Sequence, residues 1–315
     1  MFRAGAVASL SAVLLATVVS APPALAADPA KCGVVRMSDP GWADITSTNA
    51  MLGLVLEGLG YKQKVETLSV PVTFESLKNG QLDVFLGNWM PAQERFAKPL
   101  IDAGALVTIK KNLEGIRFTL AVPDYVAAAG IKDFADLAAH ADKFDRKIYG
   151  IEPGAPGNQN IQKAIDTNDF GLKGWELIES SEQAMLSQVE KAKRGQKWIV
   201  FLAWEPHPMN TKYAPGYLSG GDKYFGANYG SASVYTVTRR GYSEDCPNLA
   251  KLLRQLTFEV GIENAIMAAM ADGGASAQNA ARAELKKRPD LIGQWLDGVQ
   301  TTDGQPGLAA VQGKL

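Results

Sequence analysis

The sequence predicts an α/β protein of two similar lobes, each a mostly parallel sheet flanked by helices, with a hinge between them. The main observation is a stretch that occurs twice, at residues 80–89 and 195–204. Each copy opens with Gly-Gln, continues as an apolar run and ends in a tryptophan, and a proline follows two residues later. Short apolar runs bounded by Gly and Pro are typical of strands buried on both faces of a parallel sheet.

The second observation is the alternation of strand and helix patterns around both copies. Strands are predicted at 33–38, 64–70 and 80–89, with helices from Asp44 or Thr46 to Gly60 and at 74–79. The order repeats with strands at 115–123, 147–152, 175–180 and 195–204, and helices at 131–139, 159–166 and 183–194. Such alternation indicates parallel sheets.

These patterns divide residues 28–315 into three segments. Residues 28–112 form the first part of lobe I, and residues 113–224 form lobe II. Residues 225–315 contain one more strand at 232–238 and then mostly helices, and we expect them to return to lobe I. The chain then crosses twice between the lobes, which predicts a hinge.

Residues 1–27 have the pattern of a cleaved signal peptide. Arg3 supplies the positive charge, an apolar run follows, and Ala24-Leu25-Ala26 is a small-x-small cleavage signal. We therefore expect a periplasmic protein. In an oxidising compartment the two cysteines, Cys32 and Cys246, favour one disulfide bond, although two unpaired buried thiols would fit the same count.

Composition excludes several classes of function. There are 32 basic and 33 acidic residues and a net charge of −1, which gives no indication of nucleic-acid binding. The two histidines, His140 and His207, lie in no metal-ligand spacing, so neither a metal nor a cofactor is expected. No nucleophile elbow, Walker loop or dinucleotide fingerprint occurs, and we expect no enzymatic activity.

Three tryptophans fall at the predicted carboxyl ends of strands: Trp42, Trp89 and Trp204. Ligands of open α/β sheets bind at the carboxyl ends of strands, so these three indoles together are predicted to meet at one site, although any single tryptophan is better explained by core packing. Asp44 follows Trp42 by two residues and would otherwise serve as a helix N-cap. Aromatic faces with one carboxylate favour a cation that donates no hydrogen bonds, such as a quaternary ammonium group.

The chain also resembles the choline-binding proteins of bacterial ABC importers, within the wider glycine betaine/choline substrate-binding group. The resemblance covers essentially the whole mature chain and rests on SDPGWADIT at 38–46, DVFLGNWMP at 83–91, YGIEPG at 149–154, VFLAWEPHPMN at 200–210 and YLSGG at 217–221. It implies a type II periplasmic binding fold, a monomer that delivers its ligand to a membrane permease. It also implies an aromatic box at Trp42, Trp89, Phe118 and Trp204, with an acidic ligand contact at Asp44.

The chain departs from that family pattern at two positions. Phe118 stands where the choline binders carry a tyrosine, so the ring face is kept and the hydroxyl is lost. Ala155 stands where they carry an asparagine that holds the ligand, and the nearby Asn158 is a candidate substitute or simply a helix cap.

The predicted ligand is choline. Acetylcholine, glycine betaine, carnitine and trimethylamine N-oxide stay open as alternatives, as does a sensory role for the protein. A carboxylated ligand needs a dedicated partner. Asp44 near the box is unfavourable for such a ligand, while Arg117 and His207 leave it possible.

Overall fold

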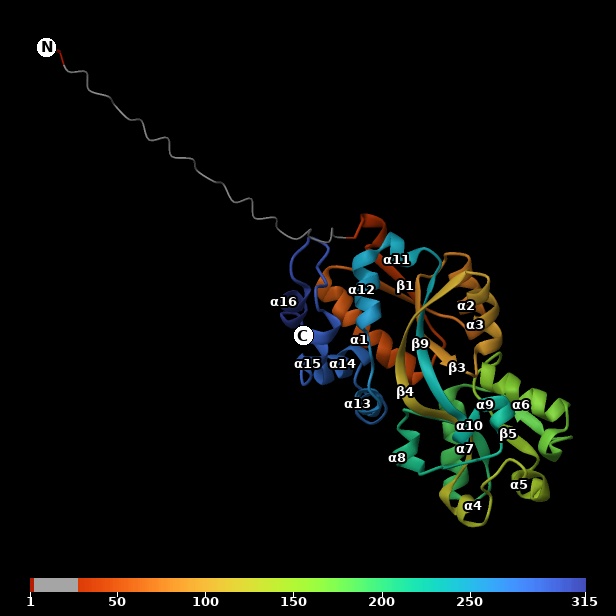
Figure 1. The fold of residues 1–315 in the computed structure, drawn as a ribbon. Helices are drawn as coiled ribbons and strands as arrows, with labels where there is room; N and C mark the ends of the chain where they lie inside the picture. Colours follow the sequence, from red (N-terminus) through yellow and green to blue (C-terminus); the bar gives the residue numbers. More distant parts are fainter. Residues whose placement is uncertain (3–27) are drawn as a thin grey trace.

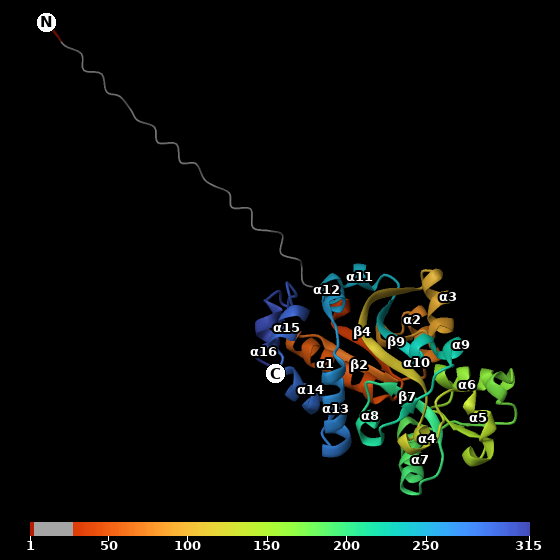
Figure 2. The ribbon, with the colours of Figure 1, turned by 60° about the horizontal axis from the view of Figure 1, so that its bottom comes forward.

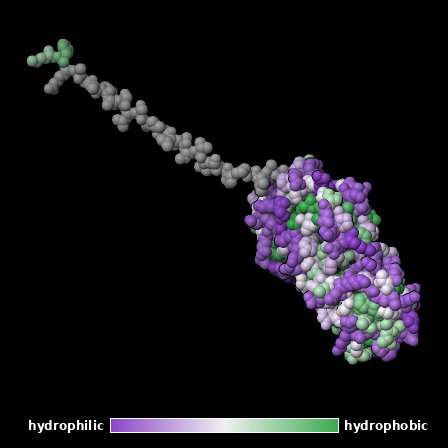
Figure 3. Space-filling model, turned by 45° about the vertical axis from the view of Figure 1, so that its right-hand side comes forward, coloured by the Kyte–Doolittle hydropathy of each residue, from purple (hydrophilic) through white to green (hydrophobic). Residues whose placement is uncertain are grey.

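The computed structural model describes residues 1–2 and 28–315, so the predicted signal peptide lies, except for its first two residues, outside the described part. Two long antiparallel strands, β4 (Leu106–Val122) and β9 (Ser231–Arg239), run side by side from one lobe to the other (Figure 1). The molecule is elongated, and the face shown in Figure 3 is mainly hydrophilic, with smaller hydrophobic areas.

The strands form one hydrogen-bonded path in the order β2-β1-β3-β9-β4-β7-β5-β6. Lobe I holds β2 (Lys62–Thr67), β1 (Val34–Asp39) and β3 (Val84–Met90), and lobe II holds β7 (Val200–Glu205), β5 (Lys147–Tyr149) and β6 (Glu176–Ile178). Neighbours within each of these sets are parallel, whereas β9 and β4 are antiparallel to the strands beside them. The predicted two-lobed, mostly parallel architecture is therefore confirmed, with an antiparallel connection between the lobes.

Helices flank the strands of both lobes. Those of lobe I are η1 (Ala30–Cys32), α1 (Ala43–Leu59), α2 (Val70–Lys78), α3 (Glu94–Asp102), α11 (Tyr242–Asp245), α12 (Pro247–Gln255), α13 (Val260–Gly273), α14 (Ala277–Leu285), α15 (Pro289–Trp295) and α16 (Gly307–Gln312). Helices α13, α14 and α16 pack against α1 and gather around it in Figure 2. The end of the chain thus lies against the first helix, and the predicted segment boundaries remain a proposal.

Lobe II contains shorter helices: α4 (Asp124–Ala128), α5 (Asp136–Ala139), η2 (Ala141–Phe144), α6 (Pro156–Asp166), η3 (Asp169–Gly171), α7 (Glu182–Arg194), α8 (Met209–Tyr213), α9 (Asp222–Phe225) and α10 (Ala227–Gly230). A two-residue strand, β8 (Gly216–Tyr217), pairs with β4 beside them. None of the helices in residues 28–315 combines the length and apolar character that crossing a membrane requires.

Several predicted elements have other bounds in the structure, and for three of them the cause is clear. The strand predicted at 64–70 ends at Thr67, because Val70 and the following proline already form the first turn of α2. Of the helix predicted at 131–139 only Asp136–Ala139 is helical, because Asp133 pairs with Ser219 in a β-bridge. Strand β4 begins at Leu106 rather than at 115, and shifts of its register against β9 interrupt the two-residue alternation that identifies a strand.

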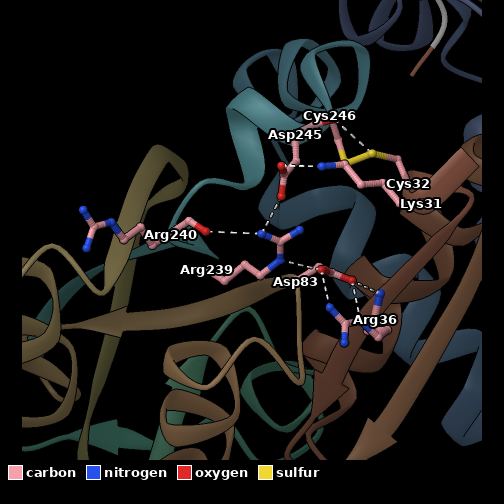
Figure 4. Close-up of polar contacts among 8 residues, drawn as sticks. All are labelled: Lys31, Cys32, Arg36, Asp83, Arg239, Arg240, Asp245 and Cys246. Atoms are coloured by element: carbon pink, nitrogen blue, oxygen red, sulfur yellow. Dashed lines mark hydrogen bonds and ion pairs between the residues drawn. A yellow bond between two sulfur atoms is a disulfide. The ribbon is translucent and has the colours of Figure 1, made fainter. Parts of the chain in front are cut away.

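The segment around Cys32 is tied to the end of β9 and to the helices that follow it by a disulfide and a chain of ion pairs. Cys32 and Cys246 are bonded, as predicted (Figure 4). Beside them the buried Asp83 carboxylate accepts hydrogen bonds from Arg36 and Arg239, which outweigh the effect of burial and leave the pKa of Asp83 below its usual value. These links fasten the end of one of the two connecting strands to lobe I.

Candidate ligand-binding site

Trp42 is positioned by the turn that leaves β1. Asp39, the last residue of the strand, accepts hydrogen bonds from the backbone N–H groups of Gly41 at 2.7 Å and Trp42 at 3.3 Å, and from the Thr46 hydroxyl at 2.6 Å. Gly41 has a φ of +94°, a value that favours glycine. Trp42 is the N-cap residue of α1, and its buried side chain lines a cavity between the lobes.

Trp89 and Trp204 occupy equivalent places near the carboxyl ends of β3 and β7, and both side chains are buried. Phe118 of β4 is the register partner of Trp204 and lies between the two indoles. Its ring centroid is 6.0 Å from that of Trp89 and 6.3 Å from that of Trp204. We call Trp42, Trp89, Phe118 and Trp204 the aromatic cage.

Gly157, in the first turn of α6, allows Phe118 to take this place. A Cβ atom at Gly157 would lie 2.6 Å from Phe118 Cζ and 3.0 Å from Leu202 Cδ1. Both distances are shorter than ordinary van der Waals contact. The absence of a side chain therefore lets the helix approach the ring closely.

Asp44 lies in the first turn of α1 and is 2% exposed. Its Oδ2 accepts a hydrogen bond from Trp89 Nε1 at 3.2 Å, and its Oδ1 has no hydrogen-bond partner. Burial raises the pKa of Asp44 to about 8, and the negative charges of Glu182 and Asp39 add to the shift. A cation beside this carboxylate would favour its ionised form.

The aromatic cage and Asp44 line one cavity, together with Ala92, Gln93, Ile151, Pro156 and Gly157. The cavity is narrow and leaves about 20 Å³ for the centre of a water-sized molecule. Its walls come from both lobes, because Trp42 follows β1 and Trp89 lies in β3, both in lobe I, while Ile151 and Trp204 belong to lobe II. A ligand must therefore enter while the lobes are further apart.

Two further predicted residues, Ala155 and Asn158, lie outside the cavity lining. Ala155 is the N-cap residue of α6 and is buried. Asn158 is fully buried, and its side chain bonds the backbone of Ile151 and Glu152 and the Glu179 carboxylate. Asn158 thus shapes the loop that carries Ile151.

His207 stands behind the cage. Its ring packs edge-on against Trp204, with centroids 5.2 Å apart. Nδ1 accepts the Met209 backbone N–H at 2.9 Å, so the ring proton lies on Nε2 and is donated to Glu182 Oε1 at 3.2 Å. Arg117 also has partners away from the cavity: it forms an ion pair with Glu205 at 3.0 Å and a cation–π contact with the ring of Tyr217.

Two glutamates of lobe II, which sequence reasoning did not select, form hydrogen bonds with lobe I. Trp42 Nε1 donates to both carboxylate oxygens of Glu152, each at 3.0 Å, and the Ala43 backbone N–H donates to Glu182 Oε2 at 3.1 Å. Burial raises the pKa of Glu152 to about 7. Both bonds join the loop that carries Trp42 to the opposite lobe.

Gln93, which lines the cavity, was also missed, because a single glutamine after a proline turn carries no distinctive pattern.

In residues 28–315 no cluster of three or more His, Cys, Asp or Glu side chains has the arrangement of a metal site. The chemistry of the cavity is therefore that of apolar and aromatic walls with a few polar atoms.

Comparison with protein families identifies the chain. Residues 33–287 match the substrate-binding domain of the ABC-type glycine betaine transport system. The chain belongs to this family. It is a family of transport substrate-binding proteins rather than of enzymes, and such proteins act outside the cytoplasm.

Two relatives of this substrate-binding domain are informative. An uncharacterised protein, ORF1, of Chromohalobacter salexigens is 47% identical over 41% of this chain and 83% of its own length. The glycine betaine/carnitine transport binding protein GbuC of Listeria monocytogenes is 29% identical over 52% of this chain and 53% of its own.

Solved structures agree with this assignment. An ABC-transporter choline binding protein in complex with choline is 51% identical, with a TM-score of 0.89 over 91% of this chain and 99% of that one. The unliganded semi-closed form of an ABC-transporter choline binding protein gives a TM-score of 0.83 at 51% identity, over 90% of this chain and 98% of that one. Lactococcal OpuAC in its closed form with glycine betaine is 25% identical, with a TM-score of 0.75 over 83% of this chain and 98% of that one.

Proposed function

We propose that the chain is the solute-binding subunit of an ABC importer and that it captures choline between its lobes and delivers it to a membrane permease. The observation that supports this most directly is the aromatic cage, which lines one interlobe cavity together with Asp44. The signal-peptide pattern at 1–27 supports export to the periplasm. We assign no catalytic residue.

The walls of the cavity suit a trimethylammonium group. Its methyl groups need apolar contact and its charge needs a negative potential, and aromatic faces provide both. Each desolvated cation–π contact contributes about 2 kcal/mol, so several of them supply most of the roughly 8 kcal/mol that a micromolar site requires. The buried Asp44 carboxyl adds a negative charge beside the rings once a bound cation has favoured its ionised form.

Choline is favoured over ligands that carry a carboxylate. Once a cation has favoured its ionised form, Asp44 presents a negative charge and an unpartnered buried oxygen, both unfavourable for a carboxylate of the ligand. Arg117, a cation that would suit glycine betaine or carnitine, is paired with Glu205 and does not line the cavity. His207 donates its ring proton to Glu182 instead.

Titration calorimetry of the mature protein tests this function. Choline, glycine betaine, carnitine and trimethylamine N-oxide are compared, and we expect choline to bind at micromolar or lower concentration and glycine betaine more weakly. Trp204→Ala should abolish tight binding, whereas Trp175→Ala, which removes a buried indole outside the lining, should lower stability and leave the affinity of the folded protein unchanged. If none of the four ligands bound measurably, the proposal would be refuted.

A further inference from the structure

Strand β3 carries a bulge at the point where it passes the cavity. Phe85 pairs with Val237 and Asn88 with Tyr235, so β3 has one residue more than β9 between these pairs. Side-chain amides bond the carbonyl groups of this irregular stretch. Asn112 Nδ2 donates to Leu86 O at 2.9 Å, and Gln93 Nε2 donates to Gly87 O at 2.8 Å.

The bond to Gly87 fixes the orientation of the Gln93 amide. A carbonyl oxygen only accepts hydrogen bonds, so the nitrogen of the amide must face Gly87 and the oxygen must face away. Gln93 is 1% exposed, lines the cavity, and its Oε1 has no hydrogen-bond partner. A buried amide oxygen without a partner is unfavourable unless a ligand supplies the donor.

We propose that Gln93 is a specificity-determining residue whose Oε1 accepts a hydrogen bond from a hydroxyl group on the ligand. Asp44 and Gln93 are the polar lining residues besides the tryptophans, and each has an unpartnered buried oxygen. Asp44 then balances the charge of the cation, and Gln93 binds the hydroxyl at the neutral end of the ligand. The inference rests on the proposed function and narrows it to hydroxylated quaternary ammonium compounds.

The wall of the cavity that faces Asp44 and Gln93 is consistent with these two roles. Phe118, Ile151, Pro156 and Gly157 line it without a polar side chain. The side-chain acceptors of the cavity therefore come from lobe I alone. A ligand that carried only methyl groups would leave Gln93 Oε1 unpaired in the complex.

The test compares choline with trimethylpropylammonium, in which a methyl group replaces the hydroxyl. We expect the wild-type protein to prefer choline by about tenfold, the effect of one buried hydrogen bond. Gln93→Met has a similar size and no acceptor in that place, so it should abolish most of this preference while the affinity for trimethylpropylammonium changes by less than about threefold. A preference that survives in Gln93→Met, or an equal loss for both ligands, would overturn the proposal.

Asn112→Leu is the matched control. It removes the other amide that bonds the bulge, and Asn112 does not line the cavity, so the preference for choline should persist. If Gln93→Met does not fold, the side-chain carbonyl resonance of Gln93 in the wild-type protein decides: it should shift with choline and not with trimethylpropylammonium, and equal shifts would refute the role. Failure of both ligands to bind the wild-type protein would instead refute the proposed function.

Discussion

Trp42 and Glu152 form a hydrogen bond from one lobe to the other, at the wall of the cavity itself. The indole N–H donates to both carboxylate oxygens at 3.0 Å, and the residues lie on loops that follow β1 and β5. Such a bond requires the lobes to be close together. The geometry therefore couples closure of the lobes to the position of one ring of the aromatic cage.

Replacing Glu152 should weaken ligand binding by destabilising the closed form. Glu152→Ala removes the acceptor of the hydrogen bond from Trp42, and we expect the dissociation constant for choline to rise about tenfold. Glu152→Gln keeps one acceptor oxygen, so its affinity for choline should lie between those of the wild type and of Glu152→Ala. Calorimetry measures the effect, and Glu176→Ala, on the exposed side of β6, serves as the control. Equal affinity in all four proteins would show that the bond does not contribute to closure.

Gly157 is the residue at which a single methyl group should damage the cage. In Gly157→Ala the new Cβ would meet Phe118 Cζ at 2.6 Å, so either the ring or α6 must move. We expect at least about a tenfold loss of choline affinity from this displacement. Gly261→Ala in α13 adds the same methyl group where no atom lies within 4 Å and should leave binding unchanged. Unchanged binding in both variants would mean that Phe118 tolerates the shift.

The rings of the aromatic cage could be predicted from the sequence, but the polar contacts between the lobes could not. Trp42, Trp89 and Trp204 could be placed because each follows a strand pattern, and strand ends meet at one edge of a sheet. Glu152 and Glu182 could not, because their partners lie more than 100 residues away, and only the closed arrangement of the lobes brings them together.

The same limit applies to the connecting strands. Strand β4 spans 17 residues, but its bulges break the alternation along the sequence, and only the pairing with β9 shows that it is continuous. The disulfide was predictable because the count of cysteines leaves a single possible pair.

Removing the disulfide should lower stability and spare binding. Cys32 and Cys246 are 214 residues apart, so their bond restricts the unfolded chain strongly. We expect the double variant Cys32→Ala/Cys246→Ala to lose about 2–4 kcal/mol of unfolding free energy. Its affinity for choline at low temperature should equal that of the wild type, because neither residue lines the cavity. Chemical denaturation and calorimetry measure the two quantities, and a matching loss of affinity would show that the link also positions β9 for closure.

Choline binding should release a proton from Asp44. The pKa of this carboxyl is about 8 without ligand, because burial and the charges of Glu182 and Asp39 favour the protonated form. A bound cation favours the ionised form and lowers the pKa in the complex. Two further carboxyls near the site also have raised pKa values: that of Glu263 on α13 lies well above its usual value because of burial and the charge of Asp44, and burial raises that of Glu152 to about 7.

The affinity for choline should therefore rise with pH and level off above about pH 8. Between the pKa of Asp44 in the complex and its pKa of about 8 in the free protein, the dissociation constant should fall about tenfold for each pH unit, because the free protein must lose one proton to bind. Calorimetry at pH 7 in buffers of different ionisation enthalpy should report close to one proton released. Asp44→Asn cannot ionise, so it should bind more weakly at pH 8 and lose most of the pH dependence. A wild-type affinity that is constant from pH 6 to pH 8 would mean that Asp44 is already ionised in the free protein, and that its charge is present before the cation arrives.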